Sequence, residues 1–313
     1  MLITVTPAPA IDWTVEVEGW EFGAVHRARS ERREPSGKGV NVSVALHRAG
    51  RATHAVLVAA GDGVDFMDRE LAALGVPHSF ASGGPVRTNL TLLVDGRADT
   101  KVNTSGAALS DSQSAALIEL VSDLADRPGA AILTAGSLPA GSDARLHARI
   151  VERARERGRY AALDTSGAAL LEGIAAGPDL VKPNAQELAE LVAAPVATLG
   201  EVRDAAHELR GRHGVGSVLV SLGADGALLV DADGELWAGA RPDRVRNAVG
   251  AGDAMLAGFL SARSDRERAL RAAVLWGGSA VAHASTFFEV LPEDRFERWC
   301  TDRIDRSYAL GLD

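Results

Sequence analysis

The sequence predicts an α/β fold in which helices cover both faces of a mostly parallel sheet. Short apolar segments alternate along the chain with longer stretches of helical periodicity, and this alternation is typical of βαβ units. Hydrophobic residues make up 46% of the 313 residues and aromatic residues only 4%. We therefore expect a core built mostly of Ala, Val and Leu, as helices packed on a parallel sheet require.

The predicted strands of the large sheet are short apolar runs, each ended by a turn residue, as is typical of buried parallel strands. Four such runs are residues 55–60, 130–134, 160–163 and 218–221. Helical patterns predict helices over residues 112–125, 144–157, 201–212 and 265–283. We expect one domain over residues 1–313, with three layers in the order helix, sheet, helix.

Two regions break this rhythm and predict a small second sheet. Their strand-like pieces are residues 13–17, 25–29, 88–94 and 100–103. Few helical residues separate these pieces, which is typical of an antiparallel sheet with one open face. We expect a β-lid formed by about residues 13–35 and 86–103 and inserted in the large domain. Because an uncovered sheet face tends to associate, we expect a homodimer through this lid.

The composition argues against several classes of protein. The formal net charge of −9 disfavours a nucleic-acid binder or a protein that docks on anionic membranes. The single cysteine, Cys300, can form no internal disulfide, so we expect a reducing, cytoplasmic location. The first residues resemble a short strand rather than a signal peptide, and no apolar run reaches the ~20 residues of a membrane span.

The strongest local motif is a glycine-rich turn, Gly250-Ala251-Gly252-Asp253, at the start of a predicted helix. The glycines allow a tight turn that exposes backbone N–H groups, and a helix N-terminus attracts anions. The carboxylate of Asp253 could accept a proton from a substrate hydroxyl while the amides hold a transferring phosphoryl group. A plain helix-entry turn explains this segment, taken alone, equally well.

Two further segments place polar side chains at helix starts. In residues 35–43, Lys38 and Asn41 share a glycine-rich loop, and the amide of Asn41 suits a sugar hydroxyl. In residues 181–188, Asn184 and Glu187 match a capping box, which explains the pair without any further function.

Two common nucleotide-binding motifs are excluded. A dinucleotide-binding fingerprint needs a third glycine or an alanine at the position of Met255. A P-loop needs a glycine at the position of Arg32 and a Ser or Thr directly after Lys38. The chain is therefore neither a Rossmann dehydrogenase nor a P-loop ATPase.

Five motifs follow one another along the chain: residues 6–12 (Thr-Pro-Ala-Pro-Ala-Ile-Asp), 37–41 (Gly-Lys-Gly-Val-Asn), 136–139 (Gly-Ser-Leu-Pro), 182–187 (Lys-Pro-Asn-x-x-Glu) and 250–253. In this order they resemble the PfkB, or ribokinase-like, family of carbohydrate kinases, in the branch of 1-phosphofructokinase and tagatose-6-phosphate kinase. The resemblance runs from residue 1 to about residue 290. It implies a ribokinase-like three-layer α/β/α domain with a mostly parallel central sheet and a small β-sheet lid, and it implies ATP and Mg²⁺ as cofactors.

The resemblance also implies a role for individual residues. Asp253 would be the base that activates the acceptor hydroxyl, and the amides of Ala251, Gly252 and Asp253, in the catalytic turn that begins at Gly250, would form the anion hole. The residues implied at the sugar are Asp12, Lys38, Gly39, Asn41, Asn89 and Ser137. The residues implied at the nucleotide are Lys182, Asn184, Ser221, Gly223, Gly226 and Gly252, and Asn184 and Glu187 would also order Mg²⁺.

Three cations indicate a substrate that already carries a phosphate. Arg27, Arg87 and Lys101 stand where phosphosugar kinases of the family have basic residues, and all three fall in the lid segments. Like charges repel, so such a cluster is unfavourable without an anion beside it, and Arg and Lys both bind phosphate. Arg27 also fits a plain surface position, because several arginines surround it.

We therefore expect phosphorylation of fructose 1-phosphate to fructose 1,6-bisphosphate. Tagatose 6-phosphate and fructose 6-phosphate are alternative substrates, as is an unphosphorylated sugar or nucleoside. A non-catalytic sugar-phosphate sensor on the same fold is the alternative from another class. Phe287 and Phe288 replace small or polar residues of many relatives near the adenine pocket. They make activation by a monovalent cation such as potassium doubtful. They could wall the adenine ring, but we expect them to be core residues.

Overall fold

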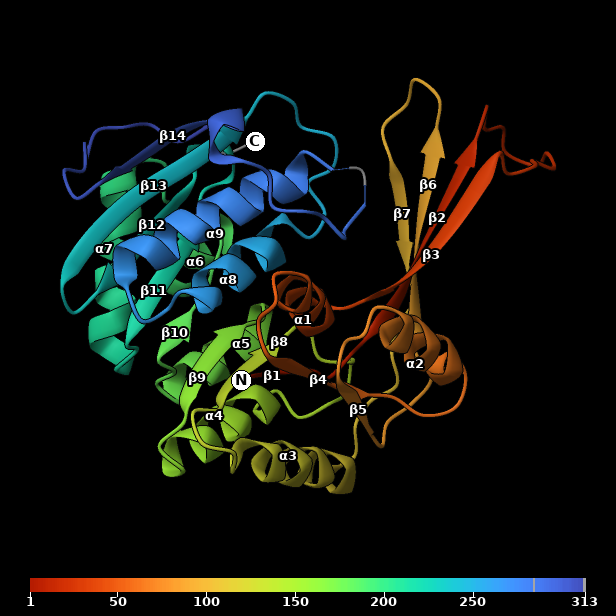
Figure 1. Cartoon of the computed structure of the whole chain (residues 1–313), viewed down its shortest axis with the longest axis horizontal. Helices are drawn as coiled ribbons and strands as arrows, with labels where there is room; N and C mark the ends of the chain where they lie inside the picture. The colour runs from red at the N-terminus through yellow and green to blue at the C-terminus, as the bar shows by residue number, and fades with distance from the viewer. Residues whose placement is uncertain (284, 312–313) are drawn as a thin grey trace.

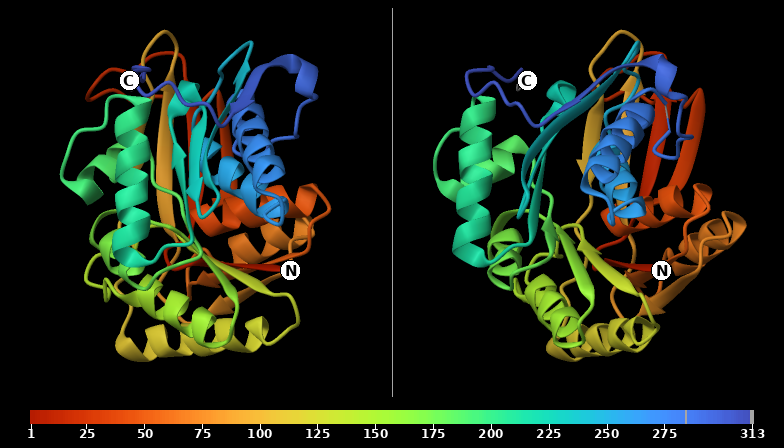
Figure 2. Two further views of the ribbon diagram at one scale, coloured as in Figure 1. Left: turned by 90° about the vertical axis from the view of Figure 1, so that its left-hand side faces the viewer. Right: turned by 60° about the vertical axis from the view of Figure 1, so that its left-hand side comes forward.

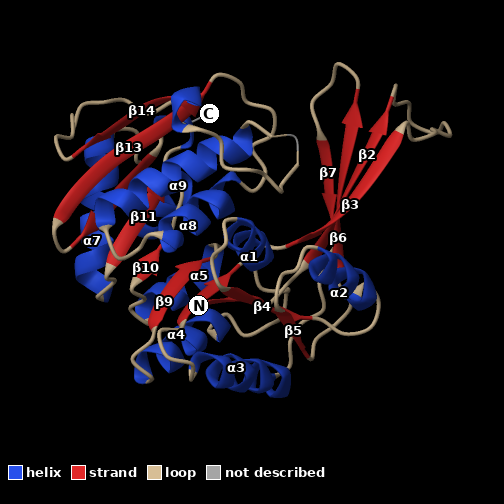
Figure 3. Ribbon diagram, viewed as in Figure 1, coloured by secondary structure: helices blue, strands red, loops and turns tan. Residues whose placement is uncertain are grey.

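A computed structural model, which describes residues 1–283 and 285–311, consists of a large and a small sheet with helices packed on the large one (Figure 1). Across these residues the large sheet has ten strands in the order β14-β13-β12-β11-β10-β9-β8-β1-β4-β5. The small sheet has four strands in the order β3-β2-β6-β7. It projects from the end of the body that carries α1 and α2, at the right of the ribbon coloured by secondary structure (Figure 3).

The large sheet is parallel from β5 to β11 and antiparallel from β11 to β14. Its strands are β1 (Leu2–Thr6), β4 (Thr53–Val58), β5 (His78–Ala81), β8 (Ala131–Ala135), β9 (Tyr160–Asp164), β10 (Leu180–Val181), β11 (Ser217–Ser221), β12 (Ala227–Asp231), β13 (Gly234–Pro242) and β14 (Phe296–Thr301). All four predicted strands are confirmed to within a few residues. The carboxyl ends of the parallel strands meet at one edge, which is where ligands bind in such sheets.

Helices cover both faces of this sheet, as Figure 2 shows. One face carries α1 (Lys38–Arg48), α2 (Val64–Ala73), α8 (Ala251–Ser261) and α9 (Arg266–Val281). The other carries α3 (Asp111–Ala125), α4 (Leu146–Glu156), α5 (Gly167–Ala175), α6 (Ala185–Val192) and α7 (Leu199–His213). Successive strand residues serve opposite faces, so Leu133 belongs to the core on the side of α1, α8 and α9, while Ile132 belongs to the core on the side of α3 and α4. The predicted three layers are confirmed.

The small sheet consists of β2 (Ala10–Val17), β3 (Ser30–Ser36), β6 (Arg87–Val94) and β7 (Thr100–Asn103). The predicted strand at residues 25–29 is wrong, because these residues form the loop before β3. The predicted antiparallel pairing is also wrong at the centre of the sheet, where β2 and β6 run parallel. β2 pairs antiparallel with β3, and β6 pairs antiparallel with β7. The action of this sheet as a lid remains a prediction.

Two short 3₁₀ helices, η1 (Gly223–Asp225) and η2 (Glu293–Arg295), complete the elements. Within the described residues, no helix has the length and apolar character that crossing a membrane requires.

Candidate active site

Asp253 lies in the first turn of α8 and is only 8% exposed. The helix begins after Gly250, whose φ of 79° favours glycine. A Cβ on Gly250 would also stand 2.8 Å from Thr286 Cγ2, so the turn leaves no room for a side chain. The first N–H groups of a helix have no partner within the helix. This turn therefore offers amide donors beside a buried carboxylate.

A second helix, α1, brings Asn41 to Asp253. The Asn41 side-chain amide donates a hydrogen bond of 2.8 Å to Asp253 Oδ2. α1 starts directly over the end of β1, because a Cβ on Gly39 would stand 2.5 Å from Thr6 Oγ1. Asn41 Oδ1 is buried without a hydrogen-bond partner among the described residues. A substrate hydroxyl can therefore donate to it.

Two lysines meet the carboxylate of Asp164 beside this pair. Lys38 Nζ donates to Asp164 Oδ1 at 2.8 Å, and Lys182 Nζ lies 3.4 Å from Asp164 Oδ2. Asp164 is fully buried. Burial alone would raise its pKa, but the charges of Lys182 and Lys38 outweigh burial, and the pKa is lowered. Lys182 Nζ also lies beside the glycine-rich turn of residues 250–253, since a Cβ on Gly252 would stand 3.4 Å from this nitrogen.

The environment of Asp253 suits a proton acceptor. Burial, and then the negative charge of Asp164, raise the pKa of Asp253 to about 6. Lys38, the hydrogen bond from Asn41 and Lys182 act in the opposite direction and limit this rise. The carboxylate is therefore ionised at neutral pH yet more basic than an ordinary aspartate, which is the tuning that general bases need.

A cavity of about 480 Å³ opens beside the glycine-rich turn. It brings together the predicted nucleotide residues Asn184, Ser221, Gly223, Gly226 and Gly252. Small and apolar residues form most of the remaining wall, among them Ala240, Pro242, Val245, Ala248, Met255, Val274, Gly277, Gly278 and Val281. An apolar slot that ends at a helix N-terminus fits an adenine ring with phosphates at the turn.

Asn184 and Glu187 form a complete capping box at the start of α6. Glu187 N donates to Asn184 Oδ1 at 2.8 Å, and Asn184 N donates to Glu187 Oε2 at 2.9 Å. The predicted cap is therefore present. Their oxygens are also the donors that Mg²⁺ prefers, and Asn184 lines the cavity, so the pair fits the predicted metal role.

The small sheet presents a polar face toward the loop that follows α9. Asp12 and Asn89 stand opposite each other in β2 and β6, and Asn89 Nδ2 donates to Asp12 Oδ1 at 2.8 Å. Ser285 lies in that loop, and its Oγ donates to Glu34 Oε1 at 2.7 Å. Asn89 Oδ1 and Arg87 Nε are buried without hydrogen-bond partners in the described part of the chain. These unpaired groups fit a polar ligand between the sheets.

The remaining predicted sugar contacts are less closely gathered. Lys101 stands opposite Thr91, two residues along β6 from Asn89, so it shares the polar face but is exposed. Ser137 is exposed in the loop after β8. Arg27 lies beyond the paired ends of β2 and β3 at Glu16, about 13 Å or more along the strand from Asp12. Arg27 is not brought to the site within one chain.

The family model for pfkB family carbohydrate kinases matches residues 4–292. The chain belongs to this family. It is 38% identical over 276 residues to 1-phosphofructokinase of Rhodobacter capsulatus, with 83% of each chain covered. It is 32% identical over 261 residues to D-tagatose-1-phosphate kinase of Bacillus licheniformis, covering 83% of this chain and 84% of that one. The crystal structure of Escherichia coli phosphofructokinase-2 in complex with potassium matches with a TM-score of 0.85 at 29% identity, covering 92% and 94%.

Membership makes the chain a pfkB carbohydrate kinase, a phosphotransferase with an alcohol group as acceptor. The predicted ribokinase-like fold is thereby confirmed. Sequence reasoning about this pfkB kinase missed Asp164, which ends the predicted strand at residues 160–163. The available signal was its place at the carboxyl end of a buried parallel strand, where polar side chains face the ligand edge.

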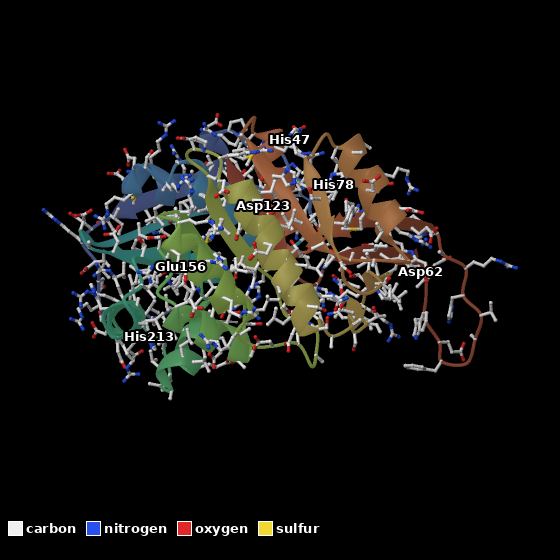
Figure 4. The ribbon with its side chains drawn as sticks, turned by 90° about the horizontal axis from the view of Figure 1, so that it is seen from below. His47, Asp62, His78, Asp123, Glu156 and His213 are labelled. Carbon is white, nitrogen blue, oxygen red and sulfur yellow. The ribbon has the colours of Figure 1, made fainter. Side chains whose placement is uncertain are left out.

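Phe287 and Phe288 of the pfkB kinase pack in the protein interior, outside the nucleotide cavity. Phe288 is buried against Trp276, which confirms a core role, and Phe287 packs partly buried beside α1 and α2. Neither lines the nucleotide cavity. Among the described residues, no group of three His, Cys, Asp or Glu side chains is arranged to hold a metal ion. The view from below shows His213 far from His47 and His78 (Figure 4).

Proposed function

We propose that this pfkB kinase transfers the γ-phosphoryl group of ATP to the free primary hydroxyl of fructose 1-phosphate, giving fructose 1,6-bisphosphate and ADP. The observation that carries the proposal is the buried, basic carboxylate of Asp253, which directly follows the cavity-lining Gly252 and is hydrogen-bonded to Asn41 of the helix after β3. Similarity to a 1-phosphofructokinase and to a D-tagatose-1-phosphate kinase supports a ketose 1-phosphate as the acceptor.

On the acceptor side, Asp253 takes the proton of the attacking hydroxyl. The amide of Asn41 holds the carboxylate and leaves its own Oδ1 for a sugar hydroxyl. The amides of Ala251, Gly252 and Asp253 at the helix N-terminus stabilise the charge that develops on the transferring phosphoryl group. Lys38 and Lys182, fixed by Asp164, add positive charge at the same place.

On the donor side, the cavity that contains Gly223 and Gly226 holds the nucleotide. Asn184 and Glu187 would order Mg²⁺, which neutralises phosphate charge when it is bound. We propose that the enzyme needs no potassium, although the E. coli phosphofructokinase-2 structure contains it. Equal rates with and without potassium in a sodium-matched buffer are the expected result.

The sugar phosphate lies on the polar face of the small sheet in this proposal. Asp12 and Asn89 bind sugar hydroxyls, and Arg87 binds the phosphate with its Nε group, which has no hydrogen-bond partner among the described residues. Burial lowers the pKa of Arg87 and Asp12 raises it, so a second anion beside this guanidinium is well placed. Lys101 lies on the same polar face, nearer the tip of the sheet.

The test is a substrate panel with ADP release and product structure as readouts. It compares fructose 1-phosphate, fructose 6-phosphate, tagatose 6-phosphate, tagatose 1-phosphate, ribose and adenosine at equal concentrations. We expect the highest kcat/KM with fructose 1-phosphate and a bisphosphate product by ³¹P NMR. A preference for fructose 6-phosphate or for an unphosphorylated sugar contradicts the acceptor. Ligand binding without ADP release supports the sensor alternative.

We further propose a cytoplasmic homodimer that buries the outer face of the small sheet. Alternation along the strands puts Trp13, Leu90 and Val102 on the face opposite Asp12 and Asn89. Val102 is 55% exposed, although a large apolar side chain gains free energy when it is buried. The same sheet of a second copy can cover this face, because a two-fold interface packs identical apolar patches against each other.

A further inference from the structure

The family match ends at residue 292, and the described residues beyond it pack against β13, the start of α7 and the loop of residues 223–226, which we call the nucleotide loop. We call residues 296–311 the C-terminal arm. It begins with β14, which pairs with the outer edge of β13. The arm then crosses the start of α7, where Leu199 N donates to Tyr308 O at 2.9 Å and Leu310 N donates to Ala197 O at 2.9 Å.

The arm contacts the nucleotide loop, residues 223–226, through hydrogen bonds to Asp225. This residue stands between Gly223 and Gly226, which both line the cavity, and it is only 5% exposed. The hydroxyl of Tyr308 donates to Asp225 Oδ1 at 2.9 Å, and Gly311 N donates to Asp225 Oδ2 at 2.8 Å. A buried carboxylate is unfavourable without hydrogen-bond donors. Both oxygens receive a donor from the arm.

Aromatic rings strengthen the same junction. Trp237 of β13 donates from Nε1 to the backbone oxygen of Asp225 at 2.8 Å. The Trp237 ring lies 5.0 Å from the Tyr308 ring, measured between centroids. Two residues farther along β13, Gly239 pairs with Trp299 of β14, and a Cβ on Gly239 would stand 2.1 Å from the Trp299 ring. The loop, β13 and the arm therefore form one packed unit.

Arg241 links the arm to the cavity wall itself. It lines the cavity, and its guanidinium lies 3.6 Å from Glu297 and 3.9 Å from Asp225. The guanidinium carbon also lies 5.6 Å from the centre of the Trp299 ring, within cation–π distance. Two residues of the arm thus help to fix a side chain that borders the nucleotide.

We propose that the C-terminal arm holds the nucleotide loop in its binding conformation and that Tyr308 acts, through Asp225, as a positioning residue for ATP. The inference rests on the proposed use of ATP. Without the Tyr308 hydroxyl, one oxygen of a buried carboxylate loses its donor and the loop gains freedom. ATP must then order the loop on binding, which weakens its affinity. The sugar contacts proposed above share none of these bonds.

The experiment compares Tyr308→Phe with Tyr160→Phe, the same chemical change at the chain's other tyrosine. Tyr160 begins β9 at the end of the strand remote from the site and packs in another core cluster. For Tyr308→Phe we expect the Kd for ADP by calorimetry and the KM for ATP to rise about fivefold to twentyfold. We expect kcat and the phosphosugar KM to stay within about twofold of wild type, and Tyr160→Phe to match wild type.

A second variant tests the route through Asp225. Asp225→Leu removes both acceptor oxygens and should weaken ADP binding at least as much, and adding Tyr308→Phe should weaken it little further, because the bond from the Tyr308 hydroxyl is already broken. Unchanged ADP affinity in Tyr308→Phe, additive losses, or a parallel rise of both KM values overturns the proposal. Loss of ADP affinity in an enzyme that phosphorylates no sugar supports the arm and contradicts only the proposed reaction. Wild-type protein that binds no ADP contradicts both.

Discussion

The Asn41 side-chain amide donates to Asp253 Oδ2 at 2.8 Å, across 212 positions of sequence. The bond connects the first turns of α1 and α8, which lie side by side over the sheet (Figure 1). An amide that donates to a carboxylate favours its ionised form, which is the form a general base needs. It also fixes where the carboxylate points. The same bond therefore tunes the acidity of Asp253 and orients it.

This bond predicts the acid limb of the pH profile. Asp253 must be ionised to accept a proton, so kcat/KM should fall as the pH drops through its pKa of about 6. Asn41→Leu removes a group that favours ionisation, so the pKa should rise and the limb should move to higher pH. Profiles of kcat/KM against pH for wild type and variant, measured with the same substrate, give this shift. The ionisation of the substrate affects both profiles equally and does not contribute to the difference between them. A limb that stays in place contradicts the pairing.

Asp253→Asn should abolish most turnover while both substrates still bind. The amide keeps the shape of the side chain but cannot take a proton, so kcat should fall by about a thousandfold. KM for ATP and for the phosphosugar should change by no more than a few-fold. Steady-state kinetics and a melting curve for the variant decide the matter. A kcat within tenfold of wild type means that another group is the base.

Asp164→Asn should damage stability as well as catalysis. The change leaves Lys38 and Lys182 beside each other without their counter-ion, and breaking such a buried pair costs about 3 kcal/mol of unfolding free energy. Removing the negative charge of Asp164 should also lower the pKa of Asp253 and move the acid limb to lower pH. Urea unfolding measures the first effect. The surface pair of Asp126 with Arg157 supplies the control: Asp126→Asn should cost less than about 1 kcal/mol.

Arg87→Ala should raise the KM for the phosphosugar about tenfold or more, because a charged hydrogen bond to the phosphate is lost. The KM for ATP should change much less. Arg97→Ala is the matched control, since Arg97 is exposed on the turn between β6 and β7. An unchanged phosphosugar KM in Arg87→Ala, or an equal change in Arg97→Ala, would remove Arg87 from the phosphate site.

Val102→Glu should split the proposed dimer. The substitution puts a charge in the apolar face of the small sheet, where association would have to bury it. Light scattering after size-exclusion chromatography should give the mass of one chain for this variant and of two chains for wild type. Leu171→Glu replaces an equally exposed apolar residue, at 56% against 55%, on α5 and should remain dimeric. Wild-type protein with the mass of a single chain contradicts the dimer at once.

The large sheet was predictable because its strands carry their own signal. Apolar runs such as residues 130–134 need burial on both faces, and a parallel sheet between two layers of helices provides it. β3 lacked that signal, since its sequence Ser-Glu-Arg-Arg-Glu-Pro-Ser is almost wholly polar. Its pairing with β2 defines it, and charged residues on an edge strand are normal. The parallel contact of β2 with β6 likewise depends on how the elements between β3 and β6 fold, so the sequence of either strand does not indicate it.

The candidate site was predictable in its motifs but not in its contacts. Glycines at 37, 39, 250 and 252 marked two helix starts, and the structure joins them through Asn41 and Asp253. Asp164 gave a weaker sign, its place at the end of a predicted strand, and one acid at a strand end is common. For Arg27, the sequence indicated a basic residue in a lid segment but not its distance from the site. That distance is set by the length of the β2–β3 hairpin, whose connecting loop contains Arg27.

The pairing of two lysines with Asp164 has a consequence for chemical labelling. The chain contains only three lysines, and Lys101 is the exposed one. Burial alone would lower the pKa of Lys38, but the charges of Asp164 and Asp253 raise it, so this amine stays protonated and is a poor nucleophile. Lys182 is shielded by burial. Of the three lysines, an acylating reagent should therefore mark Lys101 first, and acylation of Lys38 or Lys182, read by mass spectrometry, reports the opening of the candidate site.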